Sequence, residues 1–301
     1  MKKRNVLVLV NEVKDTDFHF TKKVTKFLCD HNCCVYVEKE NASFVPLALE
    51  YDKAINKIDF ALILGGDGTL LNYAHKYYDV DLTFFGVNLG RVGCLTEATK
   101  DNYEVMLMEI LNDNCFVEER NTIECCISKQ GSEPIKSLAF NEVSIQRGKL
   151  FKMLFINMLV NNNNKTSFYA DGVVVSTSTG SSAFSLSCGG PLLLPTARNY
   201  VITPINPQLR TITSLVINDT DVITLDLMED KERESYLVDK PIVVIDGYRM
   251  IEIDREDKIN LYKSDKKLKI VKVDGQASLF EPTLKVSMSS QNINNKGGNN
   301  E

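Results

Sequence analysis

The sequence predicts an α/β N-terminal domain with a parallel sheet, followed by an all-β, sandwich-like C-terminal domain. In the first 110 or so residues, short apolar runs alternate with segments of helical periodicity, which is typical of βα units. From about Cys115 onward, short runs rich in Val, Ile, Thr and Phe follow one another, and several alternate apolar with polar residues as half-buried antiparallel strands do. We therefore predict an α/β domain over 1–115, a β-rich domain over 116–288 and a disordered tail over 289–301, where Asn, Ser and Gly dominate.

Apolar runs and helical spacing place the elements of the first domain. Strands are predicted over 5–11, 33–37, 60–64 and 82–88, and helices over 17–29, 70–75 and 101–111. Ligands of parallel sheets bind off the carboxyl ends of the strands, and two glycine-containing turns, 65–69 and 88–93, are expected there.

The β-rich domain divides into short strands separated by turn residues. Strands are predicted over 122–128, 138–145, 153–160, 172–176, 200–203, 214–217, 222–228, 242–245, 250–253 and 258–262. The run of four asparagines at 161–164 is predicted as a hairpin tip, and Asp246-Gly247 as a turn after a buried strand.

Composition limits the function classes. The net charge of −5 implies no basic surface for non-specific binding to nucleic acid, and no apolar run reaches the roughly 20 residues of a membrane helix. The apolar run near the N-terminus is too short and β-branched for a signal peptide, so a cytoplasmic location is expected. The eight cysteines form no paired CxxC motif and are interpreted as buried, reduced thiols.

The turn at 65–69, Gly-Gly-Asp-Gly-Thr, carries the clearest chemistry. A strand that breaks into glycines and then enters a helix presents backbone N–H groups to an anion such as phosphate. Asp67 is unexpected there, because a carboxylate repels phosphate unless it binds a metal ion or takes a proton. The turn therefore indicates phosphoryl transfer with a built-in base or metal ligand.

Two motifs of the β-rich half add polar groups. Asn141-Glu142 lies inside the predicted strand 138–145, so one of the two side chains is expected to point inward, although an exposed edge strand would explain both. The strand after Asp171 leads into a hydroxyl- and glycine-rich run at 176–187, where small side chains would let a ligand approach and hydroxyls could bind a base or ribose. A simple turn with a helix N-cap is the alternative.

Together these residues resemble the NAD kinase family. The family pairs Gly-Gly-Asp-Gly-Thr with a downstream Asn-Glu, an Asp-Gly strand, a Thr-Gly-Ser-x-Ala-x-Ser-x-Ser turn and Gly-Gly-Pro. The matching segments occur here in the same order at 65–69, 141–142, 171–172, 179–187 and 189–191, and Ile202-Thr203-Pro204-Ile205 also matches. The glycine turn alone is not specific, since lipid kinases and phosphofructokinases have similar turns, whereas the combination is.

The resemblance implies transfer of the ATP γ-phosphoryl group to the adenosine 2′-hydroxyl of NAD, with Mg²⁺ or another divalent cation spreading the triphosphate charge. Asp67 would be the catalytic base. Asn141 and Glu142 would hold the adenosine, and Asp171 would face the nicotinamide half. The implied substrate- and nucleotide-binding residues are Gly65, Gly66, Gly68, Thr69, Asn141, Glu142, Asp171, Thr179, Ser182, Ala183, Phe184 and Ser187. The resemblance names no metal ligand, and it implies NAD and ATP as partners and a homodimer or homotetramer whose site borrows residues from a neighbouring subunit.

Some positions depart from the family pattern, among them Tyr169, Phe184 and Tyr248, where a basic residue, Tyr and Gln are usual. They bear on substrate preference and affinity more than on the reaction. Two other functions are weighed beside the NAD kinase hypothesis. A lipid kinase of the diacylglycerol or sphingosine type would explain the glycine turn and the β-rich second domain, but not the long polar turn at 177–187. A non-catalytic dinucleotide-binding regulator would explain the departures.

Overall fold

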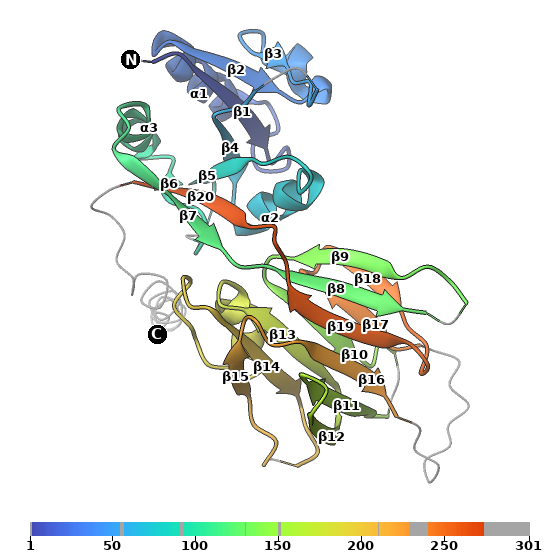
Figure 1. Cartoon of the computed structure of the whole chain (residues 1–301). Helices are drawn as coiled ribbons and strands as arrows, with labels where there is room; N and C mark the ends of the chain where they lie inside the picture. Colours follow the sequence, from blue (N-terminus) through green and yellow to red (C-terminus); the bar gives the residue numbers. More distant parts are fainter. Residues whose placement is uncertain are drawn as a thin grey trace, which may run out of the picture. The chain divides into compact units, whose positions relative to one another are not determined.

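The computed structural model describes residues 2–54, 57–90, 93–129, 131–149, 152–209, 211–228 and 240–273. These residues fall into two compact units (Figure 1). The first contains residues up to 119 together with 268–273, and the second contains residues 120–267. The predicted tail, 289–301, lies outside the described residues.

A largely parallel sheet forms the centre of the first unit. Its described strands follow the order β3-β2-β1-β4-β5-β20-β7, and β6 pairs with β5. The strands are β1 (Arg4–Val10), β2 (Cys33–Val37), β3 (Leu49–Glu50), β4 (Phe60–Gly65), β5 (Thr83–Asn88), β6 (Ala98–Thr99), β7 (Cys115–Arg120) and β20 (Leu268–Val273). The pairings of β1 with β2 and β4, and of β5 with β4, β6 and β20, are parallel, as predicted from the βα alternation.

Helices cover this sheet, and its central strands are therefore buried on both faces. They are α1 (His19–Asp30), α2 (Asp67–Lys76) and α3 (Tyr103–Leu111), with a 3₁₀ turn, η1 (Lys39–Phe44). Apolar side chains of α1 and α3 pack in one core cluster with alternate residues of β1, such as Val6 and Val8. The side chain of α2 residue Leu70 is also fully buried but lies outside that cluster, and α2 contacts β4 and β5.

One strand of the sheet comes from the far end of the described chain. Lys269 and Ile270 of β20 pair in parallel with Thr83 and Phe84 of β5. The range predicted for the β-rich domain, 116–288, therefore includes a strand that belongs to the first sheet. The chain leaves the first unit after β7 and returns to it for β20.

The second unit is a sandwich of two antiparallel sheets with the described strand orders β15-β14-β13-β10-β17-β18 and β12-β11-β16-β19-β8-β9. The first of these two antiparallel sheets contains β10 (Glu142–Gln146), β13 (Gly172–Thr177), β14 (Asn199–Ile205), β15 (Leu215–Asn218), β17 (Ile242–Ile245) and β18 (Arg249–Glu252). The second contains β8 (Ile123–Ser128), β9 (Ile135–Ala139), β11 (Leu154–Val160), β12 (Asn164–Ala170), β16 (Ile223–Leu227) and β19 (Lys258–Lys263). The short η2 (Gly180–Ser182) and α4 (Phe184–Ser187) follow β13.

Inward-facing residues of both sheets form one core, which includes Val143 and Val175 from one sheet and Ile156 and Leu261 from the other. The predicted fold class, an α/β domain with a parallel sheet plus a β-sandwich, is confirmed. The hairpin tip at 161–164 is confirmed as well, because β11 and β12 pair on either side of it and Asn161 has a φ of 53°.

One predicted strand is wrong in its extent. Residues 138–145 form the end of β9 and most of β10, which lie in different sheets, and the chain crosses over at 140–141. Asn141-Glu142 therefore lies at the crossover and the start of β10, rather than inside one strand. The apolar run continues through the crossover because Phe140 is itself buried, so periodicity alone did not reveal the break.

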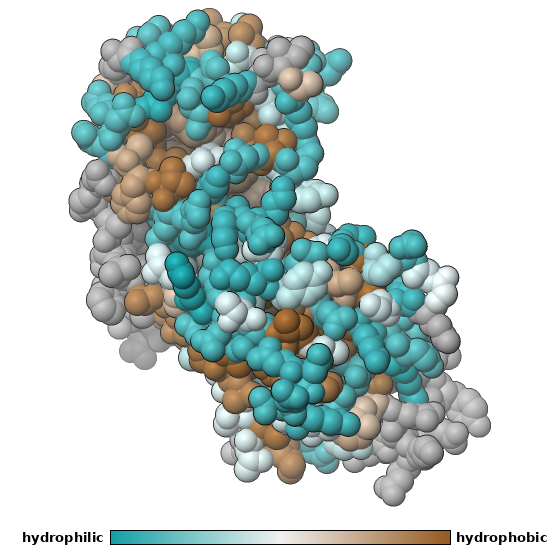
Figure 2. Space-filling view, in the orientation of Figure 1, coloured by the Kyte–Doolittle hydropathy of each residue, from teal (hydrophilic) through white to brown (hydrophobic). Residues whose placement is uncertain are grey.

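One face of the described residues is mostly polar (Figure 2). Figure 2 shows hydrophilic side chains over most of one face, with apolar side chains in scattered groups. No described helix is long and apolar enough to cross a membrane. The eight cysteines are all free, as predicted, but only Cys33 and Cys125 are buried. The other six are partly exposed, so the prediction of buried thiols is correct for two positions only.

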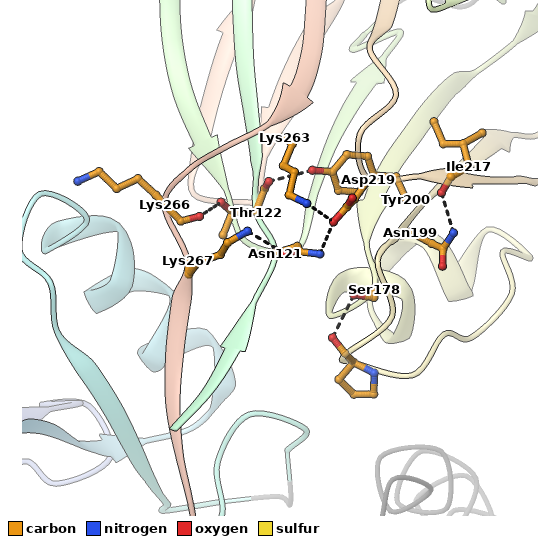
Figure 3. A network of polar contacts seen from close by, with 11 residues as sticks. Asn121, Thr122, Ser178, Asn199, Tyr200, Ile217, Asp219, Lys263, Lys266 and Lys267 are labelled. Atoms are coloured by element: carbon orange, nitrogen blue, oxygen red, sulfur yellow. Dashed lines mark hydrogen bonds and ion pairs between the residues drawn. The ribbon is translucent and has the colours of Figure 1, made fainter. Parts of the chain in front are cut away.

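A polar network joins the points where the chain enters and leaves the second unit (Figure 3). The buried Asp219 carboxylate accepts a hydrogen bond from Asn121 at 2.5 Å and pairs with Lys263 at 2.7 Å. The Thr122 hydroxyl donates to the Lys266 carbonyl at 2.6 Å, and the Tyr200 hydroxyl donates to the Thr122 carbonyl at 3.0 Å. The network therefore holds residues 121–122 beside residues 263–267.

Replacing Asp219 with alanine should destabilise the protein. The change leaves Lys263 and the Asn121 amide without their acceptor, and about a third of the Lys263 side chain is exposed, so this lysine can partly turn to solvent. We expect the free energy of unfolding to fall by about 2–3 kcal/mol, below the usual cost of breaking a fully buried pair. Urea unfolding measures this. Asp265→Ala, an exposed neighbour, should change stability by less than about 0.5 kcal/mol; equal losses in both variants would contradict the prediction.

Candidate active site

The glycine turn lies between the carboxyl end of β4 and the N-terminus of α2, as predicted. Gly66 is the extended residue before the helix, with φ −136° and ψ −172°. The Thr69 hydroxyl oxygen accepts hydrogen bonds from the Gly66 N–H at 3.3 Å and from the Asn11 side chain at 2.8 Å, so Thr69 fixes the turn. The first amides of a helix have no acceptor within it and carry the positive end of its dipole. The turn therefore presents N–H groups to an anion.

Asp67, the first residue of α2, is held by the segment at 94–96. Its Oδ2 accepts the N–H of Cys94 at 2.6 Å, and its Oδ1 accepts the N–H groups of Leu95 and Thr96 at 3.1 and 3.2 Å. The Thr96 hydroxyl lies 3.2 Å from Oδ1 as well. A carboxylate offers about four lone-pair directions, so these contacts occupy most of its accepting capacity. The Asp67 carboxylate is therefore fixed in place by its own unit.

Gly93 packs directly on this carboxylate. A Cβ atom at position 93 would overlap the Asp67 carboxyl group, with Oδ2 at 2.6 Å. Only glycine lets residues 93–96 approach closely enough to donate three successive backbone hydrogen bonds to Asp67. Gly93, from the second glycine-containing turn, thus packs against Asp67 of the first turn.

A pocket of about 590 Å³ opens over the N-terminus of α2. It is lined by Asn11, Lys14, Gly66, Asp67, Gly68, Thr69, Asn72 and Gly93. The Lys14 ammonium lies 3.3 Å from where a Cβ atom would stand on either Gly66 or Gly90, so it sits beside both glycine turns. Within the described part of the chain it makes no hydrogen bond or ion pair. The pocket thus combines helix amides, one carboxylate and one available cation.

Sequence reasoning missed Asn11 and Lys14. Both follow β1, whose Val10 pairs in parallel with Leu64 of β4, so the residues after Val10 lie next to the glycine turn. The available signal was a polar segment directly after a central buried strand, where ligands of parallel sheets bind.

In the second unit, Asn141 and Glu142 lie beside the turn that follows β13. The Asn141 carbonyl accepts the Thr177 N–H at 2.8 Å, and a Cβ atom on Gly180 would overlap the Asn141 backbone. The Glu142 side chain is 9% exposed, and within the described residues its Oε2 is buried without a hydrogen-bond partner. Burial, and then the charge of Asp246, raises the pKa of Glu142 to about 8.

The hydroxyl-rich run divides into inner and outer residues. Ser178 and Ser181 are buried, and their hydroxyls donate to the carbonyls of Pro195 and Ser178 at 3.1 and 2.7 Å. These two hydroxyls stabilise the turn, which agrees with the structural alternative considered for this run in the sequence analysis. Thr179 is buried and lies 3.4 Å from Arg120. The remaining predicted residues are half-buried or exposed and available to a ligand, namely Ser182, Ala183, Phe184 and Ser187.

Asp171 does not join this group. It precedes β13, whereas Glu142 pairs with Ser176 near the other end of that strand. Five residues of strand separate the two ends by roughly 17 Å. At its own end, Asp171 pairs with Arg147 at 3.3 Å and accepts a hydrogen bond from Asn206 at 3.2 Å.

The fold and these groups define a class of protein. A glycine turn at the carboxyl edge of a parallel sheet, with a fixed carboxylate and an available lysine, is suited to handling phosphate groups. The half-buried small residues after β13 are suited to contact a flat ring. This combination is that of an enzyme that acts on nucleotides.

Comparison with known proteins agrees with that class. Residues 6–115 match the model of the ATP-NAD kinase N-terminal domain, and residues 140–273 match that of the ATP-NAD kinase C-terminal domain. The NAD kinase of Thermoanaerobacter sp. (strain X514) is 36% identical over 277 residues, which cover 91% of this chain and 94% of the relative. The NAD kinase of Caldanaerobacter subterraneus subsp. tengcongensis is 35% identical, with the same coverage.

Two solved structures share the fold. Yeast NADH kinase complexed with NADH gives a TM-score of 0.82 at 19% identity, over 93% of this chain and 87% of that one. An NAD kinase from Archaeoglobus fulgidus in complex with ATP gives 0.73 at 24% identity, over 95% and 99%. This chain belongs to the NAD kinase family. The prediction of an NAD kinase enzyme is confirmed, and the lipid kinase hypothesis is set aside.

Proposed function

We propose that the chain transfers the γ-phosphoryl group of ATP to the adenosine 2′-hydroxyl of NAD and so makes NADP. The observation that carries the proposal is Asp67, a fixed carboxylate at the N-terminus of α2 in a pocket lined by glycines and a lysine. The 2′-oxygen attacks the γ-phosphorus, the bond to the β–γ bridging oxygen breaks, and ADP leaves. The proton of the 2′-hydroxyl goes to Asp67 as the oxygen attacks.

The contacts of Asp67 add a condition to this role. Its carboxylate already accepts three backbone N–H groups from residues 94–96. To accept a proton, one oxygen has to turn away from at least one of these donors. We infer that substrate binding moves residues 93–96 relative to Asp67, while the remaining hydrogen bonds keep the carboxylate oriented.

Lys14 is proposed to bind the phosphate groups of ATP together with the amides of the glycine turn. Its ammonium lies beside Gly66 and Gly90 and is available within the described residues. An ammonium in a partly enclosed pocket offsets the negative charge of a phosphate chain and of Asp67.

Lys14→Met should raise the KM for ATP about 10- to 100-fold, the loss of a charge-assisted hydrogen bond of 1.5–3 kcal/mol. The KM for NAD should change much less, because the proposed adenosine residues lie elsewhere in the chain. Steady-state kinetics with each substrate varied in turn measures both values. Lys39→Met removes an exposed lysine paired with Glu50 and should leave both values unchanged. An unaltered KM for ATP in the Lys14 variant would refute the assignment.

A divalent cation is proposed to arrive with ATP rather than to occupy a protein cage. Among the described residues no group of three or more His, Cys, Asp or Glu side chains could hold a metal ion. The donor set near the glycine turn contains one carboxylate, Asp67, whose oxygens are already hydrogen-bonded. These residues do not fit a resident metal site, and the cation would be bound by the phosphate oxygens of ATP, whose charge it would spread.

The adenosine of NAD is proposed to bind at Asn141, Glu142 and the half-buried or exposed residues after β13, namely Ser182, Ala183, Phe184 and Ser187. The buried hydrogen-bonding oxygen of Glu142 lacks a protein partner in the described chain and suits a ligand donor. Asp171 is proposed to serve the nicotinamide half in a second copy of the chain, because the length of β13 separates it from Glu142. This assignment requires the homodimer or homotetramer that the family resemblance implies.

The test is NADP formation from NAD, ATP and Mg²⁺, followed with an NADP-specific dehydrogenase. Turnover supports the proposal and excludes the non-catalytic regulator. NAD binding by calorimetry without turnover would support the regulator instead. NADH should be tested beside NAD as acceptor, since one structural neighbour was solved with NADH.

A further inference from the structure

The Asp246 carboxylate receives three successive backbone N–H groups. Its Oδ2 accepts from Phe140 at 2.7 Å, and its Oδ1 accepts from Asn141 and Glu142 at 2.8 Å each. Asp246 lies in the turn between β17 and β18 with a φ of 49°, and its own N–H donates to the Glu142 carbonyl at 3.0 Å. The turn predicted from Asp246-Gly247 is confirmed, and the Asp246 side chain hydrogen-bonds to the backbone of residues 140–142.

The carbonyl side of the same segment is held by a different element. The Thr177 N–H donates to the Asn141 carbonyl and the Thr177 hydroxyl donates to the Phe140 carbonyl, each at 2.8 Å. The Asp246 carboxylate therefore accepts the N–H groups of residues 140–142, and Thr177 donates to the carbonyls of Phe140 and Asn141. These hydrogen bonds fix the backbone conformation of the crossover between β9 and β10, and with it the point from which the Asn141 and Glu142 side chains extend.

Asp246 also affects the charge state of Glu142. The Glu142 side chain lies among Asp246 and Cys188, the titratable groups whose charges couple to it. Burial, and then the negative charge of Asp246, favours the protonated form of Glu142, whose pKa is about 8. Near neutral pH the carboxyl is therefore mostly protonated and can donate as well as accept a hydrogen bond.

We propose that Asp246 is a positioning residue for nucleoside binding, which fixes Asn141 and Glu142 through the backbone of residues 140–142 and contacts no substrate itself. The inference rests on the proposed role of Asn141 and Glu142 in holding the adenosine of NAD. A carboxylate suits this task because its two oxygens accept three N–H groups at once, whereas a carboxamide offers only one oxygen. It also ties the adenosine site to the β17–β18 hairpin, which lies about 100 positions later in the sequence.

Asp246→Asn tests this role, since it keeps the size of the side chain and removes one acceptor oxygen and the charge. The KM for NAD should rise about tenfold or more, the effect of losing one or two hydrogen bonds to a charged acceptor, while the KM for ATP changes less than about threefold. Without the Asp246 charge, the Glu142 carboxyl ionises at lower pH. We expect an inflection of the KM for NAD near pH 8 in the parent, and in the Asp246→Asn variant it should move to lower pH.

Two controls separate positioning from general damage. Asp254→Asn changes an exposed aspartate of the next loop, paired with Lys240, and should leave both KM values and the pH profile unchanged. In a Glu142→Gln background the pH inflection should be absent, and adding Asp246→Asn should then shift nothing further. Effects of the two substitutions that simply add would count against action through Glu142.

The proposal is overturned if Asp246→Asn leaves the KM for NAD and its pH profile as in the parent, or raises both KM values equally together with a lower Tm. If the Asn variant does not fold, Asp246→Ser retains one acceptor and takes its place. Failure of both to fold would assign the carboxylate to the fold itself and overturn the specific role. Absence of NAD phosphorylation in the parent protein would instead refute the proposed function.

Discussion

Asp67→Asn should produce a folded protein that binds NAD and forms almost no NADP. The carboxamide cannot take the proton of the 2′-hydroxyl, and general base catalysis contributes about 10²–10⁴-fold to a rate. We therefore expect kcat to fall by at least two orders of magnitude. The KM for NAD should stay within a few-fold, because the proposed adenosine contacts do not include Asp67.

The substitution also has a structural cost, which has to be measured separately. The new NH₂ group faces a backbone N–H of residues 94–96, whichever way the carboxamide is turned, because both carboxylate oxygens of Asp67 accept such groups. A donor left without its acceptor costs about 1–3 kcal/mol, which is visible in a urea titration but is not enough by itself to abolish folding. NAD binding by calorimetry then distinguishes a folded but catalytically inactive variant from an unfolded one.

Near-parental turnover by Asp67→Asn would remove Asp67 from the chemistry. The carboxylate would then be a structural acceptor for the 94–96 segment, and the reaction would need another base. A loss of NAD binding equal to the loss of rate would likewise contradict the assignment, since it would place Asp67 in substrate binding rather than in catalysis.

The architecture was predictable wherever the signal was local. Buried parallel strands such as β4 are continuous apolar runs, and the glycines that follow β4 mark its end, so the edge that carries the site could be found from the sequence. Residues 268–273 were not predicted as a strand, and β5, the strand with which they pair, lies about 190 residues earlier in the sequence. A strand pattern does not state which sheet it joins.

The candidate site was predictable to a similar extent. Asp67 stands out because a carboxylate is unexpected in a phosphate-binding turn. Lys14 could not be recognised without the pairing of β1 with β4. Asp246 was interpreted only as a turn, because its three hydrogen bonds reach residues about 105 positions earlier. The residues proposed to bind or react were suggested by local motifs, whereas those proposed to position them depend on long-range contacts.

Gly180→Ala should damage the adenosine half of the site through the backbone. A Cβ atom on Gly180 would overlap the carbonyl carbon and oxygen of Asn141. These are backbone atoms held by Thr177 and, through the preceding N–H groups, by Asp246. No flexible side chain can move aside, so the segment that carries Asn141 and Glu142 has to shift. Overpacking of this kind costs about 1–3 kcal/mol of stability.

The functional loss should exceed the loss of stability, because a shift of the Asn141 backbone displaces both proposed adenosine contacts, Asn141 and Glu142, at once. We expect the KM for NAD to rise by about 10- to 100-fold, or 1.4–2.7 kcal/mol, with a much smaller change in the KM for ATP. Gly131→Asn is the matched control: its φ is +74°, nothing lies within 4 Å of its added Cβ atom, and asparagine tolerates that conformation. This control should leave both KM values and the Tm unchanged. A Gly180 variant with parental affinity for NAD would show that the crossover at 140–142 can move without consequence, and the adenosine site would have to be sought elsewhere in the sandwich.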